Sequence, residues 1–330
     1  MKDILEKLYQ YQTLSQKEAY LVLSNITQGI YSEIELASFV TIFNMRTITI
    51  EELKGFRAAM LDLAININLS EYEAIDIVGT GGDGKNTFNI STLSSFVVAA
   101  CGYKVIKHGS YGSSSVSGSS NMLEYFGYTF SNKVDELKKE LDQVGLCFLH
   151  APLFHPAMKN IALVRKSLKV KTFFNILGPL INPAQPKYQL LGTFNQQTAR
   201  LYHNLLEELG KTYTVITSLD GYDEVSLTSD VKVYSNVGEK QLTTLDFGIK
   251  NKLNFKDIEG GKTIEENAKI FLSIVEGKGT TNQNQVVIAN SALAIQSINP
   301  SKSLLICLEE AKESLHNKKV LSIFKKCINS

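Results

Sequence analysis

The chain has 330 residues, of which 44% are hydrophobic and 20% are charged. This composition is that of a globular protein and excludes a chain that is disordered throughout. Lysine and arginine total 34 and aspartate and glutamate total 33, which gives a net charge of +1. Such a balance argues against a nucleic-acid-binding protein and a polybasic membrane-binding protein, although it leaves room for a local basic patch.

The N-terminal sequence MKDILEKLYQYQ mixes Asp, Glu and Lys with its apolar residues, unlike a signal or transit peptide. The longest apolar stretches, such as 96–101, are too short to span a bilayer. Four cysteines stand far apart, without the spacing of a zinc knuckle or a redox pair, so we expect reduced thiols: Cys101, Cys147, Cys307 and Cys327. These features predict a cytoplasmic protein without a membrane partner.

Residues 1–70 carry one helix signal after another. Three segments fit a capping box, in which a hydroxyl and a carboxylate satisfy the first free amides of a helix: Ser15–Glu18, Ser32–Glu35 and Thr49–Glu52. Apolar residues follow each box at helical spacing, beginning with Tyr20, Leu21 and Leu23 after the first. No strand signal interrupts them, so we expect a helical domain over residues 1–70 that serves in packing, hinging or dimerisation.

From residue 71 onward, short apolar runs alternate with helical patterns. The expected strands are 75–78, 104–107, 146–150, 188–192 and 213–217, followed by a β-rich stretch at 231–245. The expected helices are 91–100, 122–126, 134–144, 198–209, 263–275, 285–295 and 302–328. This alternation predicts an α/β domain over residues 71–330 with a mainly parallel central sheet. Five of the six prolines lie between Pro152 and Pro186, which we interpret as a crossing segment between two lobes.

A glycine-rich turn, Gly79-Thr-Gly-Gly-Asp-Gly84, follows the first expected strand. It matches the dinucleotide pattern G-x-G-x-x-G, but that fold needs a helix beginning within the motif and an acidic residue after the next strand, and neither is present. It also resembles a P-loop, but Asn86 stands where a magnesium-binding Ser or Thr is required. Two interpretations remain: a plain tight turn, and the one we favour, a phosphate site made by backbone amides and the helix start at Ser91-Thr92.

Two further segments carry polar chemistry. Lys107-His108 ends the second expected strand and leads into the Ser/Gly-rich stretch 109–120. That stretch is either a surface linker or an oxyanion site, and its position beside a Lys-His pair favours a site. Asp223 and Glu224 follow the strand at 213–217 and suit either a solvated turn or a magnesium site shared with phosphate.

Seven motifs make the chain similar to the anthranilate phosphoribosyltransferases of tryptophan biosynthesis: Gly79–Asp83, Asn89–Thr92, Lys107–Gly109, His155–Lys159, Val164-Arg165, Phe174–Leu180 with Asn182–Ala184, and Asp223-Glu224. The resemblance covers nearly the whole chain. It implies a small helical domain and a larger α/β domain related to the pyrimidine nucleoside phosphorylases, with the active site between them and a homodimer formed through the helical domain. The implied reaction joins anthranilate to phosphoribosyl pyrophosphate, releases pyrophosphate and requires Mg²⁺.

The resemblance also assigns residues to each ligand. Phosphoribosyl pyrophosphate would be bound by Gly79, Gly82, Asp83, Thr87, Asn89, Ile90, Ser91, Thr92, Lys107, Ser115 and Ser119. Two magnesium ions per subunit would be held through the pyrophosphate by Ser91, Asp223 and Glu224. Anthranilate would contact Gly79, His108, Ser110, His155 and Arg165, with the guanidinium facing its carboxylate. The alternative is that the histidines are structural and Arg165 is an exposed helix charge. No general base is identified, and His203 and His316 match nothing and are expected on the surface.

One loop departs from the family pattern, which reads Lys-His-Gly-Asn-Arg and then Ser-Lys-Ser-Gly-Ser-Ala-Asp. Ser110 replaces an asparagine expected at anthranilate, and Tyr111 and Val116 replace two cations expected near the phosphates. Lost donors and charges should weaken binding. Three hypotheses follow: a functional variant, an enzyme for another aromatic amine, or a non-catalytic relative that binds phosphoribosyl compounds. A nucleoside phosphorylase is disfavoured, because it needs no carboxylate pair for pyrophosphate-bound metal.

Overall fold

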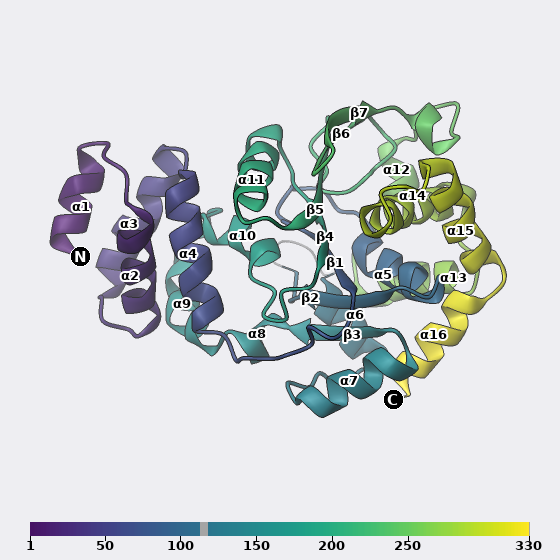
Figure 1. Ribbon diagram of the computed structural model, residues 1–330, viewed down its shortest axis with the longest axis horizontal. Coiled ribbons are helices and arrows are strands. Elements are labelled where there is room, and N and C mark those ends of the chain that lie inside the picture. The colour runs from purple at the N-terminus through teal and green to yellow at the C-terminus, as the bar shows by residue number, and fades with distance from the viewer. Residues whose placement is uncertain (113–117, 330) are drawn as a thin grey trace. The chain divides into compact units, whose positions relative to one another are not determined.

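The computed structural model describes residues 1–112 and 118–329 (Figure 1). Its internal contacts divide the chain into two units. The first unit combines residues 1–67 with 151–183, and the second combines residues 68–150 with the chain from 184 onward. Most of the proline-containing segment 152–186 therefore belongs to the first unit.

Helices and short helical turns make up the first unit. They are α1 (Lys2–Tyr9), α2 (Gln16–Thr27), α3 (Glu33–Met45), α4 (Ile50–Asp62), α8 (Ala151–Phe154), η1 (Pro156–Met158), α9 (Lys159–Leu168), α10 (Phe174–Leu177) and η2 (Gly178–Leu180). All three predicted capping boxes are confirmed, with Ser15, Ser32 and Thr49 as the caps of α2, α3 and α4. Of the apolar residues that follow the first box, Leu21 is 47% exposed, whereas its neighbour Val22 lies on the buried face of α2.

Phenylalanine rings form the centre of the first unit. Phe56 of α4 stacks on Phe173 with the ring centroids 4.7 Å apart. Phe39 of α3 packs edge-on against both rings at 6.1 Å, and Phe43 contacts the same group. Because Phe173 comes from the later segment, these rings join residues 151–183 to the N-terminal helices.

An ion pair at Glu52 of α4 joins this helix to the chain segments that precede α2 and follow α3. Glu52 is fully buried, and its carboxylate accepts hydrogen bonds from Arg46 Nη1 at 2.9 Å and Nη2 at 2.5 Å. It also accepts the amides of Leu14 and Thr49, both at 2.9 Å. Burial alone would raise the pKa of Glu52, but these donors outweigh it and hold the pKa below its ordinary value.

A seven-stranded sheet organises the second unit, with the strand order β3-β2-β1-β4-β5-β6-β7. The strands are β1 (Ala74–Gly79), β2 (Lys104–Gly109), β3 (Leu146–His150), β4 (Tyr188–Gly192), β5 (Thr212–Ser218), β6 (Val231–Ser235) and β7 (Gly238–Leu242). The first five pair in parallel, and β6 and β7 add antiparallel neighbours at one edge. The predicted fold class, a small helical domain with a larger, mainly parallel α/β domain, is confirmed.

The other helical elements of the second unit are α5 (Ile90–Ala100), α6 (Ser119–Tyr125), α7 (Val134–Gln143), α11 (Gln196–Glu208), η3 (Thr244–Phe247), α12 (Phe255–Ile258), α13 (Ile264–Val275), α14 (Thr281–Ile298), α15 (Leu304–His316) and α16 (Lys319–Ile328). Helices α5 and α14 share one apolar core with β1, β2, β4 and β5 (Figure 1). The prediction of a single helix over 302–328 is wrong, because the chain breaks at Lys318, whose φ is +63°.

Two predictions about cysteines and membranes can be compared with the fold. All four cysteines are free thiols, as expected. Within residues 1–112 and 118–329, none of the helices has both the length and the apolar character needed to cross a bilayer.

Candidate active site

Polar segments gather at the carboxyl edge of the parallel strands in the second unit. β1 ends at Gly79, β2 at Gly109 and β5 at Ser218, and each strand is followed by one of the three polar segments singled out in the sequence. Ligands bind at this edge in open α/β sheets because successive loops converge there. Hydrogen bonds link these three polar segments to one another.

Asp223 lies against two paired glycines at the ends of neighbouring strands. Gly79 and Gly192 are register partners in β1 and β4. A Cβ on Gly79 would lie 2.2 Å from Asp223 Oδ2, and a Cβ on Gly192 would lie 1.6 Å from the Asp223 carbonyl oxygen. The same Oδ2 accepts the Gly81 amide at 2.6 Å. The glycines therefore make the space that brings the carboxylate to the glycine-rich turn.

Glu224 reaches the start of α5. Its Oε1 accepts the backbone amide of Ser91 at 3.1 Å. The helix is capped by Asn89, whose side chain accepts the Thr92 amide at 3.2 Å. Because α5 begins at Ile90, the helix starts after the glycine-rich motif and not within it, which confirms the predicted departure from a dinucleotide fold.

Two residues that sequence reasoning missed fix the backbone around the carboxylates. Ser218 Oγ donates to the Glu224 carbonyl at 2.6 Å. Asn290 of α14 accepts the Val225 amide at 3.0 Å and donates to the Val225 carbonyl at 2.9 Å. An asparagine within the apolar run of α14 was the available signal, because a buried amide in a helix needs partners outside it.

Lys107 is buried beside the same group, with only 2% of its surface exposed. Its ammonium donates to the Ile77 carbonyl and to Ser91 Oγ, the latter at 3.3 Å. Burial lowers the pKa of Lys107 to about 8, although Asp76, Glu224 and Asp223 act in the opposite direction. A buried cation next to a helix start suits a bound phosphate.

Burial and mutual repulsion shift both carboxylates toward the protonated form. The pKa of Asp223 rises to about 6, first through burial and then through the charge of Asp83. The pKa of Glu224 rises well above its ordinary value through burial and the charges of Asp223 and Asp83. The described residues contain no group of three or more His, Cys, Asp or Glu side chains placed to hold a metal. The two carboxylates are hard oxygen ligands of the kind that magnesium shares with phosphate.

The glycine-rich turn is an irregular loop that presents its backbone. Gly81, Gly82 and Gly84 have φ values of +64°, +69° and +77°, which favour glycine. Asp83 Oδ1 accepts the Lys85 amide at 2.9 Å and so closes a local turn. Thr87 forms a β-bridge to Glu259, which anchors the end of this segment.

The second loop places its predicted residues next to one another. Ser119 Oγ donates to the Ser110 carbonyl at 3.3 Å. His108 is buried, and its amide donates to Asp76 Oδ1 at 3.2 Å. Ser115 and Val116 fall outside the described residues.

His155 and Arg165 belong to the first unit, unlike the other residues assigned to substrates. His155 Nε2 lies 3.1 Å from the Ile181 carbonyl, and burial lowers the pKa of this histidine to about 4, so it is neutral at pH 7. The Arg165 guanidinium lies 5.7 Å from the ring centre of Phe174, and burial lowers its pKa. Of the histidines expected on the surface, His316 is exposed, but His203 is half-buried and bonds the Tyr213 hydroxyl at 2.7 Å.

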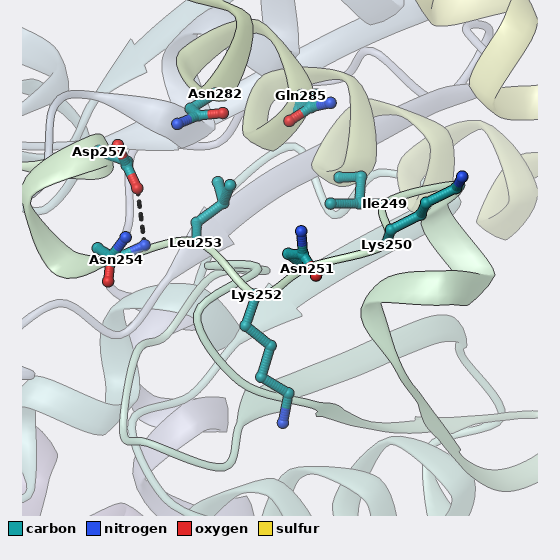
Figure 2. Close-up of a pocket in the computed structure, with 10 residues that line it drawn as sticks. Ile249, Lys250, Asn251, Lys252, Leu253, Asn254, Asp257, Asn282 and Gln285 are labelled. Carbon is teal, nitrogen blue, oxygen red and sulfur yellow. Dashed lines mark hydrogen bonds between the residues drawn. The ribbon is translucent and has the colours of Figure 1, made fainter.

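A separate hollow in the second unit is lined by Gly248, Ile249, Lys250, Asn251, Lys252, Leu253, Asn254, Asp257, Asn282 and Gln285 (Figure 2). Within it, Asp257 accepts the Asn254 amide at 2.7 Å. None of the residues assigned to a substrate or to magnesium lines this hollow.

Comparisons with known proteins identify the family of the chain. Residues 2–64 match the helical bundle domain of the glycosyl transferase family, and residues 71–321 match its a/b domain. The chain is 54% identical to an anthranilate phosphoribosyltransferase of Flavobacterium psychrophilum and 51% identical to one of Christiangramia forsetii, in each case over 99% of this chain and 98% of the relative.

Solved structures give the same result. The chain is similar to the anthranilate phosphoribosyltransferase of Thermus thermophilus, with a TM-score of 0.91, 30% identity and 98% of each chain covered. It is also similar to the Saccharomyces cerevisiae enzyme in complex with PRPP and Mg, with a TM-score of 0.87, 26% identity and coverage of 98% of this chain and 96% of that one. Because residues 2–64 and 71–321 match the two domains of the glycosyl transferase family, and about half of the residues are identical to those of the two bacterial relatives, the chain belongs to the anthranilate phosphoribosyltransferase family.

Proposed function

We propose that this protein transfers the phosphoribosyl group of phosphoribosyl pyrophosphate to the amine of anthranilate and releases pyrophosphate, the second step of tryptophan biosynthesis from chorismate. The observation that carries the proposal is the contact network at one edge of the sheet. It joins Gly81 to Asp223, Ser91 to Glu224, and Lys107 to Ser91. The name that the relatives bear supports the same reaction.

Phosphoribosyl pyrophosphate would lie along the glycine-rich turn and the start of α5. Backbone amides and the helix dipole there favour phosphate oxygens. The Thr92 hydroxyl is buried without a hydrogen-bond partner among the described residues, as expected of a group that awaits a ligand oxygen. We assign to this ligand Gly79, Gly82, Asp83, Thr87, Asn89, Ile90, Ser91, Thr92, Lys107 and Ser119. Ser115 is assigned from sequence alone.

Magnesium fits the donors of this site. The raised pKa values of buried Asp223 and half-buried Glu224 show that two carboxylate charges are unfavourable here, and a divalent cation would stabilise the charged forms. We assign Ser91, Asp223 and Glu224 to two magnesium ions per subunit, held through the pyrophosphate. Bound magnesium would stabilise the negative charge of the departing pyrophosphate.

The chain's own residues would act through position and charge. The anthranilate amine is aromatic and neutral at pH 7, so its attack on the anomeric carbon needs no prior deprotonation, and we assign no general base. Positive charge builds at that carbon as the bond to pyrophosphate breaks. We assign anthranilate to Gly79, His108, Ser110, His155 and Arg165, with Arg165 on its carboxylate.

We further propose a cytoplasmic homodimer that pairs through the helical unit. Large apolar side chains are exposed on the adjacent helices α3 and α9, where Ile34 is 80%, Met45 81% and Leu163 63% exposed. Large apolar side chains exposed on neighbouring helices favour association with another protein surface. Light scattering should give twice the 36.6 kDa chain mass, and Ile34→Ser with Leu163→Ser should shift it to the monomer. A dimer unaffected by this double variant would contradict the assignment.

A fluorescence assay tests the reaction directly. The chain has no tryptophan, so anthranilate emission can be followed with little protein background. Emission should fall only when protein, magnesium and phosphoribosyl pyrophosphate are all present. Binding of phosphoribosyl pyrophosphate without such decay would favour the alternatives of another aromatic amine as acceptor or a non-catalytic relative.

A charge-matched pair of variants tests the carboxylates. Asp223→Asn with Glu224→Gln should abolish turnover at saturating magnesium while leaving the fold intact by circular dichroism. The control is Glu309→Gln with Glu313→Gln on the exposed face of α15, which removes the same charge elsewhere. Near-normal turnover in the first variant would refute the metal assignment.

A further inference from the structure

Two short chain segments, 109–112 and 118–121, are held together directly beside the proposed site. The Ser110 carbonyl accepts both Ser119 Oγ and the Ser120 amide at 3.3 Å. The Gly112 amide donates to Asn121 Oδ1 at 2.9 Å. These bonds fix Ser110, which is assigned to anthranilate, and Ser119, which is assigned to phosphoribosyl pyrophosphate, relative to each other.

The two segments pack so closely that there is no space for a Cβ on Gly109 or Gly118. A Cβ on Gly118 would lie 2.0 Å from the Gly112 nitrogen and 2.6 Å from the Tyr111 carbonyl carbon. A Cβ on Gly109 would lie 2.3 Å from Ser119 Oγ. Backbones at such close approach transmit a displacement from one segment to the other instead of absorbing it.

Tyr111 anchors the first segment to the protein around it. Its ring packs edge-on against His150, with the centroids 4.9 Å apart and the planes at 78°. Its hydroxyl donates to Glu124 Oε1 of α6 at 2.7 Å. The side chain therefore contacts a ring and a carboxylate of the surrounding protein.

His150 anchors the second segment in turn. It is buried at the end of β3, stacked on Phe130 at 4.7 Å, with its Nδ1 hydrogen-bonded to Ser120 Oγ at 2.8 Å. Tyr111 and Ser120 thus meet the same imidazole from the two segments. Ser120 and Asn121, like Ser110 and Tyr111, are positions where the chain departs from the family pattern.

We propose that Tyr111, His150, Ser120 and Glu124 form a brace that positions Ser110 and Ser119 for the two substrates. Tyr111 is a positioning residue and does not replace the missing cation as a phosphate ligand. The inference rests on the proposed function and explains how the altered loop is compatible with it. A residue that contacts phosphate affects only phosphoribosyl pyrophosphate, whereas the brace affects both substrates, because it holds one residue assigned to each.

Steady-state kinetics of Tyr111→Phe and Tyr111→Arg test the brace. Losing one hydrogen bond of ordinary strength should raise the KM of both substrates in Tyr111→Phe by about fivefold, with kcat nearly unchanged. Tyr111→Arg should raise both KM values further, because it also removes the ring from His150. The matched control is Tyr125→Phe, a half-exposed tyrosine on α6 outside the brace. Thermal unfolding of all variants should stay close to the wild type, which separates positioning from loss of fold.

Three outcomes would overturn the proposal. Tyr111→Arg could lower the KM of phosphoribosyl pyrophosphate, Tyr111→Phe could match Tyr125→Phe, or Tyr111→Phe and Glu124→Ala could combine additively where a shared bond requires coupling. Calorimetric binding of phosphoribosyl pyrophosphate with magnesium separates this result from the proposed reaction. Suppose that the wild type binds phosphoribosyl pyrophosphate but does not turn over anthranilate. Weaker binding of phosphoribosyl pyrophosphate by Tyr111→Phe than by the wild type would then support the brace and refute the reaction. A wild type that binds no phosphoribosyl pyrophosphate would refute both.

Discussion

Gly192→Ala places a methyl group where the structure has the backbone of Asp223. The added Cβ would lie 1.6 Å from the Asp223 carbonyl oxygen and 2.7 Å from its carbonyl carbon, whereas real Cβ contacts almost never fall below 3.0 Å. The obstacle is backbone, so no side-chain rotation can relieve it. The carbonyl must therefore retreat by about 1.4 Å, or β4 must move away from it by a similar amount.

This displacement should lower activity strongly in a protein that still folds. Moving a positioned catalytic group by about 1 Å can cost roughly a hundredfold in rate. Overpacking of this kind typically costs about 1–3 kcal/mol of unfolding free energy. We therefore expect kcat/KM to fall by about 100-fold at saturating magnesium, while the variant stays folded by circular dichroism.

Gly178→Ala is the matched control, because Gly178 has a negative φ and open space where its Cβ would be. Gly79→Ala provides a second variant with a softer clash, against the Asp223 carboxylate at 2.2 Å instead of its backbone. It should lose activity even if Gly192→Ala fails to fold. Turnover within threefold of the wild type in a folded Gly192→Ala protein would refute the role given to the glycine pair.

Two further predictions concern stability. Burial raises the pKa of Glu140 to about 7 despite a hydrogen bond from Tyr128, so the stability gained by protonating it is complete at low pH and lost as pH rises through 7. Glu140→Gln should thus raise the unfolding free energy, measured in urea, by about 1–2 kcal/mol at pH 8, after allowance for partial exposure, and by much less at pH 5. Equal gains at the two pH values would show that the ionisation of Glu140 is not the cause. Glu52→Gln leaves the half-buried Arg46 guanidinium without its counter-charge and should cost about 2–4 kcal/mol in urea unfolding at pH 7, whereas a loss below about 1 kcal/mol would show that the pair contributes little.

Local signals were sufficient to predict where the first helices begin. The capping boxes at Ser15, Ser32 and Thr49 lie within single helical turns, so their residues could be paired without the fold. The break at Lys318 shows the limit of such signals. Lys318 adopts a left-handed conformation that glycine usually takes at the end of a helix. A lysine in the sequence does not predict such a helix end.

The contacts that assemble the candidate site join residues far apart in the chain. Gly81 and Asp223 are 142 positions apart, and Ser91 and Glu224 are 133 apart. Sequence reasoning could name these residues from their motifs, but strand order and register decide which of them meet. The same holds for Gly192, whose importance depends on its register partner in β1.

The division of the helical unit between two stretches of chain has a consequence for how the protein is made. During synthesis, residues 1–67 emerge first, while Phe173, which stacks on Phe56, follows more than a hundred residues after that phenylalanine. The aromatic face of α3 and α4 therefore stays uncovered until β1, β2 and β3 have also been made. The N-terminal helices cannot complete their fold ahead of the rest, so the nascent chain depends on keeping that apolar face from other partners in the meantime.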